Sequence, residues 1–230
     1  MIPASEERPI KILDLACGLG PARVPTAKRY AGREVHYVGV DEERPRGREV
    51  LKWTARFSRI PPERRARFTE EFRPAYLDFH SPERLKEALQ RVVGGEKFDE
   101  IHLHALPAAE SAAHDRGPET LKVIAALLKK GGRFYHMFEG SSPLLDLVPK
   151  TFGRDAARTS EDLRRIREAA AGAGLVVDRF GGRSAATGYK WAGAGMRGSA
   201  ERAGDAYELL AKDYSDFGAS HFIIFRKPAR

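Results

Sequence analysis

The stretch Lys11-Ile-Leu-Asp-Leu-Ala-Cys-Gly-Leu-Gly-Pro21 joins an apolar run to two closely spaced glycines. The apolar run predicts a buried strand, and a proline just after the glycines suits the first turn of a helix. Glycine adopts backbone angles that a Cβ excludes, and it lets a ligand approach the main chain closely. The start of the helix would offer free N–H groups to a polar or anionic ligand. We therefore interpret this stretch as a loop that binds a nucleotide-type cofactor.

Downstream of this loop, predicted strands alternate with predicted helices. The strands are predicted over residues 10–16, 35–40, 75–77, 98–106, 133–138, 175–180 and 221–225, and the helices over 21–32, 45–57, 82–93, 118–130 and 160–171. This alternation predicts an α/β fold with a doubly wound, mostly parallel sheet of seven strands. We expect a single domain over residues 1–230, in which residues 179–220 form an insertion or lid between the last two strands.

The composition is that of a globular protein with a basic charge balance. The 230 residues carry a net charge of +8 and include one cysteine, so no intrachain disulfide can form. No apolar run approaches the roughly 18 residues that a membrane-spanning helix needs. The first residues contain acids where a secretory signal would be basic and then apolar. We expect a cytoplasmic protein without a membrane partner.

The glycine loop discriminates between two kinds of cofactor. A dinucleotide loop needs a small residue at the position of Arg23, where close helix–strand packing occurs. The residues Asp14–Gly20 instead resemble the acid-x-x-x-Gly-x-Gly motif of the class I S-adenosylmethionine-dependent methyltransferases, with Ala22 in the place of a third glycine. The stretch Leu128–Phe134 is similar to the glycine turn before the fifth strand of that family. The resemblance extends from residue 10 to about residue 140 and implies a Rossmann-like methyltransferase fold.

The resemblance also implies the cofactor S-adenosylmethionine, with S-adenosylhomocysteine as its product. Asp41 would accept hydrogen bonds from the ribose hydroxyls, while Asp78 and Phe79 would contact the adenine ring. Cys17 lies inside the loop, where we expect it to pack rather than to act as a nucleophile. The cofactor-binding residues that we expect are Asp14, Ala16, Cys17, Gly18, Gly20, Asp41, Glu42, Asp78, Phe79 and His104.

Histidines gather near the predicted ends of the central strands. Methyl transfer mainly requires alignment, and a base is needed only when the acceptor must lose a proton. His102 and His104 would face the same side of their strand, and His80 and His136 belong to the neighbouring strands. His104, and secondly His80, are the candidates for a catalytic base, although for any single histidine a structural, hydrogen-bonded role in the sheet is the favoured interpretation. A metal site of His102, His104 and His136 is the less favoured interpretation, and we expect no metal.

The acceptor is less well specified than the cofactor. Residues 98–104 are weakly similar to strand 4 of the tRNA guanine-N7 methyltransferases and their relatives that act on ribosomal RNA. The sequence departs from that group after Pro107, where its acidic Pro-Asp-Pro-Trp-type loop is missing. The sequence also lacks the (Asp/Asn)-Pro-Pro-aromatic loop that is typical of amino-group methylation of bases.

Two basic stretches favour an RNA substrate. Nine basic residues and two acids lie between Arg44 and Arg67, and five basic residues and one acid lie between Arg179 and Arg202. The second stretch is rich in glycine, and we expect its Trp191, Tyr189, Arg183 and Arg197 to bind substrate, with the indole stacking on a base. Structured RNA is therefore the leading substrate class. The alternatives are a small-molecule O- or N-methyltransferase, in which the insertion is a lid, and a non-catalytic binding subunit with a cofactor fold.

Overall fold

The computed structural model describes residues 8–18, 22–42, 57–103, 117–138, 156–183, 190–192 and 221–229. Its strands are β1 (Ile10–Leu15), β2 (Glu34–Asp41), β3 (Arg67–Pro74), β4 (Phe98–Leu103), β5 (Leu128–Phe138), β6 (Val176–Arg183), β7 (Lys190–Ala192) and β8 (His221–Arg226). Its helices are α1 (Arg23–Arg29), the 3-10 helix η1 (Pro62–Arg64), α3 (Pro82–Val93), α4 (Gly117–Leu127) and α5 (Ala156–Gly172). Among these helices, none has the length and apolar character to span a membrane.

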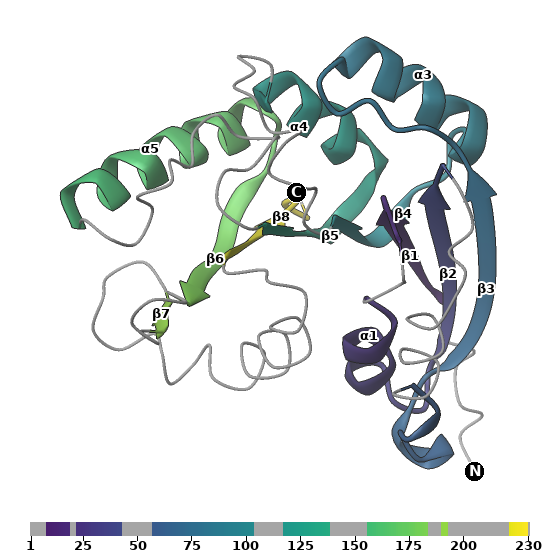
Figure 1. Ribbon diagram of the computed structural model, residues 1–230. Helices are drawn as coiled ribbons and strands as arrows, with labels where there is room; N and C mark the ends of the chain where they lie inside the picture. Colours follow the sequence, from purple (N-terminus) through teal and green to yellow (C-terminus); the bar gives the residue numbers. More distant parts are fainter. Residues whose placement is uncertain are drawn as a thin grey trace.

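The strands form one twisted sheet in the order β3-β2-β1-β4-β5-β8-β6-β7 (Figure 1). Strands β1 to β5 are parallel to one another, and β8 lies antiparallel between β5 and β6. The predicted fold class is confirmed: this is an α/β fold with a doubly wound, mostly parallel sheet. Six of the strands overlap those expected, the third strand lies earlier in the sequence than expected, and the three-residue β7 adds an eighth at the edge, within residues 179–220.

The helices cover the two faces of the sheet unequally. In Figure 1, α3, α4 and α5 lie above the sheet and α1 lies below it. The upper face is apolar, and Leu13, Ile101 and Phe134 belong there to a large buried core with residues of all three helices. The lower face contains a smaller apolar cluster around Ile12 and Tyr37. Successive strand residues point to opposite faces, so one strand serves two different environments.

Helix α3 begins and ends as its sequence predicts. Ser81 is the N-cap, and its side chain accepts a hydrogen bond from the Arg84 backbone N–H at 3.5 Å, with Pro82 in the first turn. Gly94, with a φ of +57°, closes the helix at Val93. The confirmed bounds fix the segment that leads from β3 toward β4.

Other predicted bounds were wrong, above all those of the third strand. Residues 75–77 are not a strand; β3 instead pairs with β2 through all eight residues from Arg67 to Pro74. Its sequence, Arg-Phe-Thr-Glu-Glu-Phe-Arg-Pro, lacks an apolar face because β3 is an edge strand with mostly partly or fully exposed side chains. Strand β5 begins at Leu128, five residues before its predicted start, and α1 ends three residues before Gly32. The predicted helix over 45–57 lies almost entirely outside the described residues.

Candidate functional site

The glycine loop makes a tight backbone turn at the carboxyl end of β1. Ala16 and Gly18 both have positive φ angles, of 49° and 44°, on either side of Cys17. Such an angle is unusual for alanine, and strained backbone of this kind tends to occur at functional sites. The Cys17 N–H donates to the Val40 carbonyl at 3.1 Å, which ties the turn to β2. Gly20, another predicted cofactor residue, lies outside the described residues.

Asp41 connects the end of β2 to this turn. Its Oδ2 accepts a hydrogen bond from the Gly18 N–H at 2.7 Å, and its Oδ1 accepts one from the Glu42 N–H at 2.7 Å. Each carboxylate oxygen has two lone pairs, so one acceptor position on each oxygen remains for a ligand. Asp41 is half-buried and Glu42 is exposed at the same strand end. The carboxylate of Asp41 is thus held in place and still able to accept from the two hydroxyls of a ribose.

Cys17 is packed beneath the loop rather than presented to solvent. A Cβ on Gly39 would lie 3.0 Å from the Cys17 Sγ, so the glycine in the middle of β2 makes room for this side chain. Burial, together with the nearby Asp14 and Asp41 carboxyl groups, raises the pKa of the thiol far above its ordinary value. A thiol in this state is a poor nucleophile. The geometry supports the packing role that the sequence suggests for Cys17.

Asp14 lies fully buried in β1, underneath the glycine loop. The Tyr37 hydroxyl donates a hydrogen bond to its Oδ2. Burial raises the pKa of Asp14 to about 8, although the bond from Tyr37 and the charge of Arg23 act in the opposite direction. The carboxyl group is therefore mostly protonated at neutral pH. It belongs to the support of the loop, and its atoms are not on the surface that a ligand would contact.

The predicted adenine-binding residues lie between β3 and α3. The Asp78 Oδ1 accepts a hydrogen bond from the His80 N–H at 3.1 Å, and the Arg84 Nη1 lies 3.7 Å from its Oδ2. Phe79 is 4% exposed and belongs to the apolar core, and its carbonyl accepts a hydrogen bond from Thr120. His80, the second candidate base, is half-buried in this turn, away from the strand end where it was expected. Asp78 is partly accessible, whereas the ring of Phe79 is engaged in the core.

A buried carboxylate lies deeper on the lower face of the sheet. Glu100 accepts hydrogen bonds from Arg29 Nη1 at 2.8 and 2.7 Å, from Tyr30 at 2.6 Å and from Tyr135 at 3.0 Å. Burial alone would raise the pKa of Glu100, but Arg29, His102 and Tyr30 together lower it to about 2. Arg29 and Tyr30 end α1, so this network attaches the far end of α1 to β4 and β5.

The histidines of β4 and β5 do not form one group. His102 lies 3.2 Å from Glu100 and stacks on the Tyr135 ring at 4.6 Å, on the lower face. His136 follows Tyr135, stacks against Phe134 at 5.9 Å and belongs to the upper face. Burial lowers the pKa of His136 to about 3, so it is neutral. A metal site that combines His102 and His136 is thereby excluded, and in the part of the chain that the structure describes no three His, Cys, Asp or Glu side chains are grouped to hold an ion.

Two of the predicted substrate-binding residues, Arg183 and Trp191, lie toward one edge of the sheet. The backbones of Gly182 and Arg183 in β6 pair with those of Trp191 and Lys190 in β7. Five strand spacings of about 4.8 Å separate β7 from β1, which places Trp191 roughly 24 Å from the glycine loop along the sheet. The structure therefore does not bring Trp191 next to Asp41. His104, Tyr189 and Arg197 lie outside the described residues.

Sequence reasoning missed the residues that support the loop from below. Tyr37, Glu100 and Tyr135 were not among the expected site residues, yet they connect Asp14, His102 and α1. A usable signal was present, because Asp14, Glu100 and His102 are polar residues inside otherwise apolar strands. Buried polar groups need partners, so polar residues in central strands indicate a hydrogen-bonded layer.

Comparisons with known proteins give likenesses of fold. No protein-family model matches the sequence, and no curated protein matches it. An O-methyltransferase family protein from Burkholderia thailandensis is 16% identical over 96% of this chain and 52% of its own, with a TM-score of 0.45. The antibiotic-resistance methyltransferase Kmr is 15% identical over 95% of this chain and 87% of its own, with a TM-score of 0.48. The [4+2]-cyclase SpnF is 16% identical over 97% of this chain and 76% of its own, with a TM-score of 0.45.

This chain spans about half the length of the Burkholderia protein. A likeness of fold does not fix an activity. The function of this chain therefore has to follow from its own residues.

Proposed function

We propose that this chain is an S-adenosylmethionine-dependent methyltransferase whose acceptor is structured RNA. The observation that carries the proposal is the hydrogen bond from the Gly18 N–H to Asp41, which joins the strained glycine turn of β1 to the acid that ends β2. In parallel α/β sheets, ligands bind at the carboxyl ends of the strands, where these two elements meet. The motif that resembles the methyltransferase family is located at this same point.

The roles of the chain's own residues follow from this arrangement. Asp41 would hold the ribose hydroxyls with its two remaining acceptor positions, and Asp78 would accept from the adenine amino group. When bound, S-adenosylmethionine supplies a methyl group on a sulfonium, which needs only an aligned nucleophile for transfer. His104, which follows β4 in the sequence, is the proposed acceptor of the proton when the attacking group carries one.

The charge of the chain supports the choice of RNA. Three arginines are exposed in the described part of the basic stretch Arg44–Arg67: Arg67 contacts Glu34 at 3.4 Å, whereas Arg59 and Arg64 lie around η1. No ion pair is recorded for either of them within the residues described, so their charges are free to attract phosphates. The net charge of +8 acts in the same direction.

The cofactor assignment is tested by calorimetric titration with S-adenosylmethionine. The variant Asp41→Ala should bind about 1–3 kcal/mol more weakly, roughly 5- to 150-fold, because it loses charged acceptors for two hydroxyls. The affinity of Asp41→Asn should lie between those of the wild type and Asp41→Ala, since its amide keeps one acceptor oxygen. The matched control is Glu87→Ala, which removes an exposed acid of α3 and should leave affinity unchanged. Equal affinity of Asp41→Ala and the wild type would refute the role of Asp41.

The acceptor class is tested by incubating the protein with methyl-labelled cofactor and total RNA. Label that enters RNA and resists protease supports the proposal. Cofactor binding without labelled RNA would redirect the search to small-molecule acceptors. Absence of any cofactor binding would leave the non-catalytic binding subunit as the remaining interpretation.

A further inference from the structure

A second basic surface lies at the end of the sheet opposite the glycine loop. Strands β1, β4 and β5 are parallel, so their amino ends share one edge, and β8, which is antiparallel, ends there too. We call the basic side chains at this edge the amino-end surface; they are Arg8, Lys11, Lys97, Lys129, Lys130 and Lys227. The surface is formed by residues that are far apart in the sequence, and the basic stretches noted in the sequence do not include it.

The cations of the amino-end surface outnumber the acids beside them. Arg8 and Lys129 share one carboxylate, that of Asp99, at 3.3 and 2.6 Å. Lys11 contacts Glu96 at 2.9 Å, and this carboxylate also binds Arg73. The surface thus keeps a positive surplus even where ion pairs form.

Two further lysines of this surface are bound to uncharged groups. Lys97 donates to the carbonyl of Ala126 at 2.5 Å, and Lys227 donates to those of Ala125 and Leu128 at 3.0 and 3.1 Å. Both ammonium groups stabilise the carboxyl end of α4, where the helix dipole is negative. Partial burial, and then the charges of Lys97 and Lys130, lower the pKa of Lys227, so these three lysines lie close enough to repel one another.

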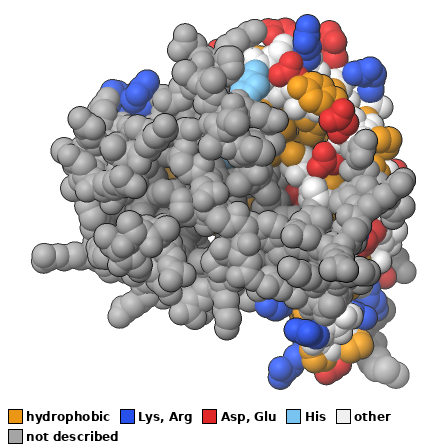
Figure 2. Space-filling view, viewed as in Figure 1, with side chains coloured by type: hydrophobic (Ala, Val, Ile, Leu, Met, Phe, Trp, Pro, Cys, Tyr) orange, Lys and Arg blue, Asp and Glu red, His pale blue; other side chains and the backbone are white. Residues whose placement is uncertain are grey.

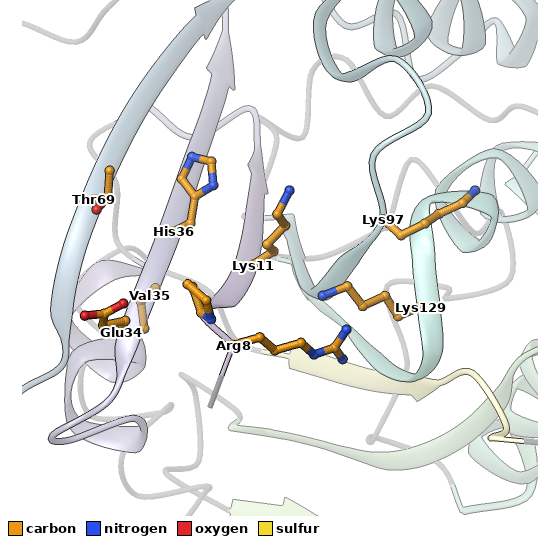
Figure 3. Close-up of a pocket in the computed structure, with 9 residues that line it drawn as sticks. Arg8, Lys11, Glu34, Val35, His36, Thr69, Lys97 and Lys129 are labelled. Carbon is orange, nitrogen blue, oxygen red and sulfur yellow. The ribbon is translucent and has the colours of Figure 1, made fainter. Parts of the chain in front are cut away.

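The amino-end surface is concave. A cavity of about 540 Å³ lies here, and its charged lining includes Arg8, Lys11, Lys97 and Lys129, with Glu34 and His36 on the β2 side. Figure 3 shows Lys129 extending toward β1 and Arg8 reaching toward the same region, whereas Lys97 points away from them. Glu34 contacts Arg67 at 3.4 Å, which offsets its charge. A hollow rimmed by cations suits a phosphate of a polymer better than it suits a flat bilayer.

The surrounding surface also argues against a membrane. Among the residues described, only Tyr76 and Val176 are large hydrophobic side chains with substantial exposure. Tyr76 follows β3, away from this edge, and a single exposed valine is ordinary for a soluble surface. An amphipathic membrane-surface element has apolar side chains that insert beside its cations, and the described residues at this edge present no group of such side chains. On another part of the surface, over α3 at the upper right of Figure 2, hydrophobic, acidic and basic side chains are mixed.

We propose that the amino-end surface binds the phosphate backbone of a structured RNA and holds it at a distance from the glycine loop. The proposal deepens the proposed function, because it adds a docking site for the same substrate class. The six-residue β1 separates the two ends of the sheet by roughly 20 Å. A nucleic-acid strand covers that distance in about six nucleotides at 3.4 Å each, so one RNA can reach both ends.

The test measures the binding of a fluorescein-labelled RNA hairpin by anisotropy over a range of salt concentrations. The variant R8Q/K130Q removes two exposed cations of the surface that do not support α4. Its affinity should fall about tenfold, and the slope of log K against log salt should decrease by about 2, because each lost phosphate contact lowers it by about 1. The charge-matched control R91Q/K122Q, on α3 and α4, should retain the affinity and slope of the wild type.

Several results would overturn the proposal. Equal losses in R8Q/K130Q and R91Q/K122Q would show a general charge effect and no docking site. The docking site would also be excluded if the wild type did not bind the hairpin. The same conclusion would follow if the wild type bound phosphatidylserine vesicles and R8Q/K130Q lost that binding but still bound the hairpin. The RNA-labelling assay separates the two proposals. If RNA is methylated but R8Q/K130Q binds the hairpin as tightly as the wild type, only the docking site is refuted. If R8Q/K130Q selectively loses hairpin affinity but no RNA is methylated, only the assignment of RNA as the acceptor is refuted.

Discussion

The two faces of the sheet are built from the same strands but by different physical means. Leu13 and Asp14, Ile101 and Glu100, and Phe134 and Tyr135 are neighbours in sequence whose side chains point to opposite faces. The upper face is an apolar core under three helices, whereas the lower face is a buried hydrogen-bonded layer against α1. The apolar face supplies stability, and the polar face fixes the position of the glycine loop.

The difference has an energetic basis. Each fully buried side chain such as Leu13 or Phe134 contributes about 1.5–3 kcal/mol by leaving water. Burying Glu100 with Arg29 contributes much less to the free energy of unfolding, since the desolvation of both charges offsets their attraction. The polar layer is directional, however, because its hydrogen bonds hold only when α1 and β4 are aligned.

The largest expected effect is on the apolar face. Phe134→Ala should lower the free energy of unfolding by about 3–5 kcal/mol, because Phe134 is fully buried and stacks on Phe225 at 5.6 Å. Urea denaturation monitored by circular dichroism measures this loss. Phe134→Leu, which keeps most of the volume, should cost less than about 1.5 kcal/mol. A loss below 1 kcal/mol for Phe134→Ala would mean that the upper face is not the main source of stability.

The next effect concerns pH and the polar face. Folded Asp14 keeps its proton to about pH 8, whereas unfolded Asp14 releases it near its ordinary pKa of 3.8. The folded state therefore binds more protons between these values, and stability should fall as the pH rises through this window. Asp14→Asn cannot ionise, so between pH 5 and pH 8 it should lose less stability than the wild type, by on the order of 3 kcal/mol.

Urea denaturation at both pH values provides the comparison for Asp14. Glu87→Gln, an exposed control on α3, should follow the wild type at each pH. Identical pH dependence in Asp14→Asn and the wild type would show that Asp14 ionises normally in the folded protein.

The smallest expected effect comes from one hydrogen bond of the polar layer. Tyr135→Phe removes the hydrogen bond to Glu100 but keeps the ring that stacks on His102. The free energy of unfolding should therefore fall by about 1.5 kcal/mol. Thermal denaturation at pH 7 detects such a change, and Tyr76→Phe, at a tyrosine that is 68% exposed, is the control. If Tyr135→Phe cost as much as Phe134→Ala, the contrast between the two faces would disappear.

The sequence was sufficient for the features that depend on local patterns. The apolar run before Gly18, the cap Ser81 and the alternation of strands and helices predicted the fold class, and the structure confirms it. The position of Asp41 opposite the glycine turn also followed, since both end neighbouring strands. Its hydrogen bond to Gly18 is a tertiary detail that adds support to the predicted cofactor role.

The features that escaped prediction depend on pairing across strands. Strand β3 has no apolar period because it lies at an edge, and only its full register with β2 defines it. Glu100 and Tyr135 meet because β4 and β5 pair with a register shift between Phe98 and Glu100, which no single strand reveals. The same register places His102 and His136 on opposite faces, although both lie near the ends of central strands.

The attachment of α1 through Tyr30 and Arg29 also bears on the entropy of ligand binding. The segment between β1 and α1 is held at one end by the bonds of Cys17 and Gly18 to β2, and the helix after it is held at its far end by Glu100. A chain whose ends are fixed has fewer conformations to lose when a ligand orders it. A ligand that binds this loop therefore pays a smaller ordering cost, and loosening the distant Glu100 network should weaken binding without removing a single ligand contact.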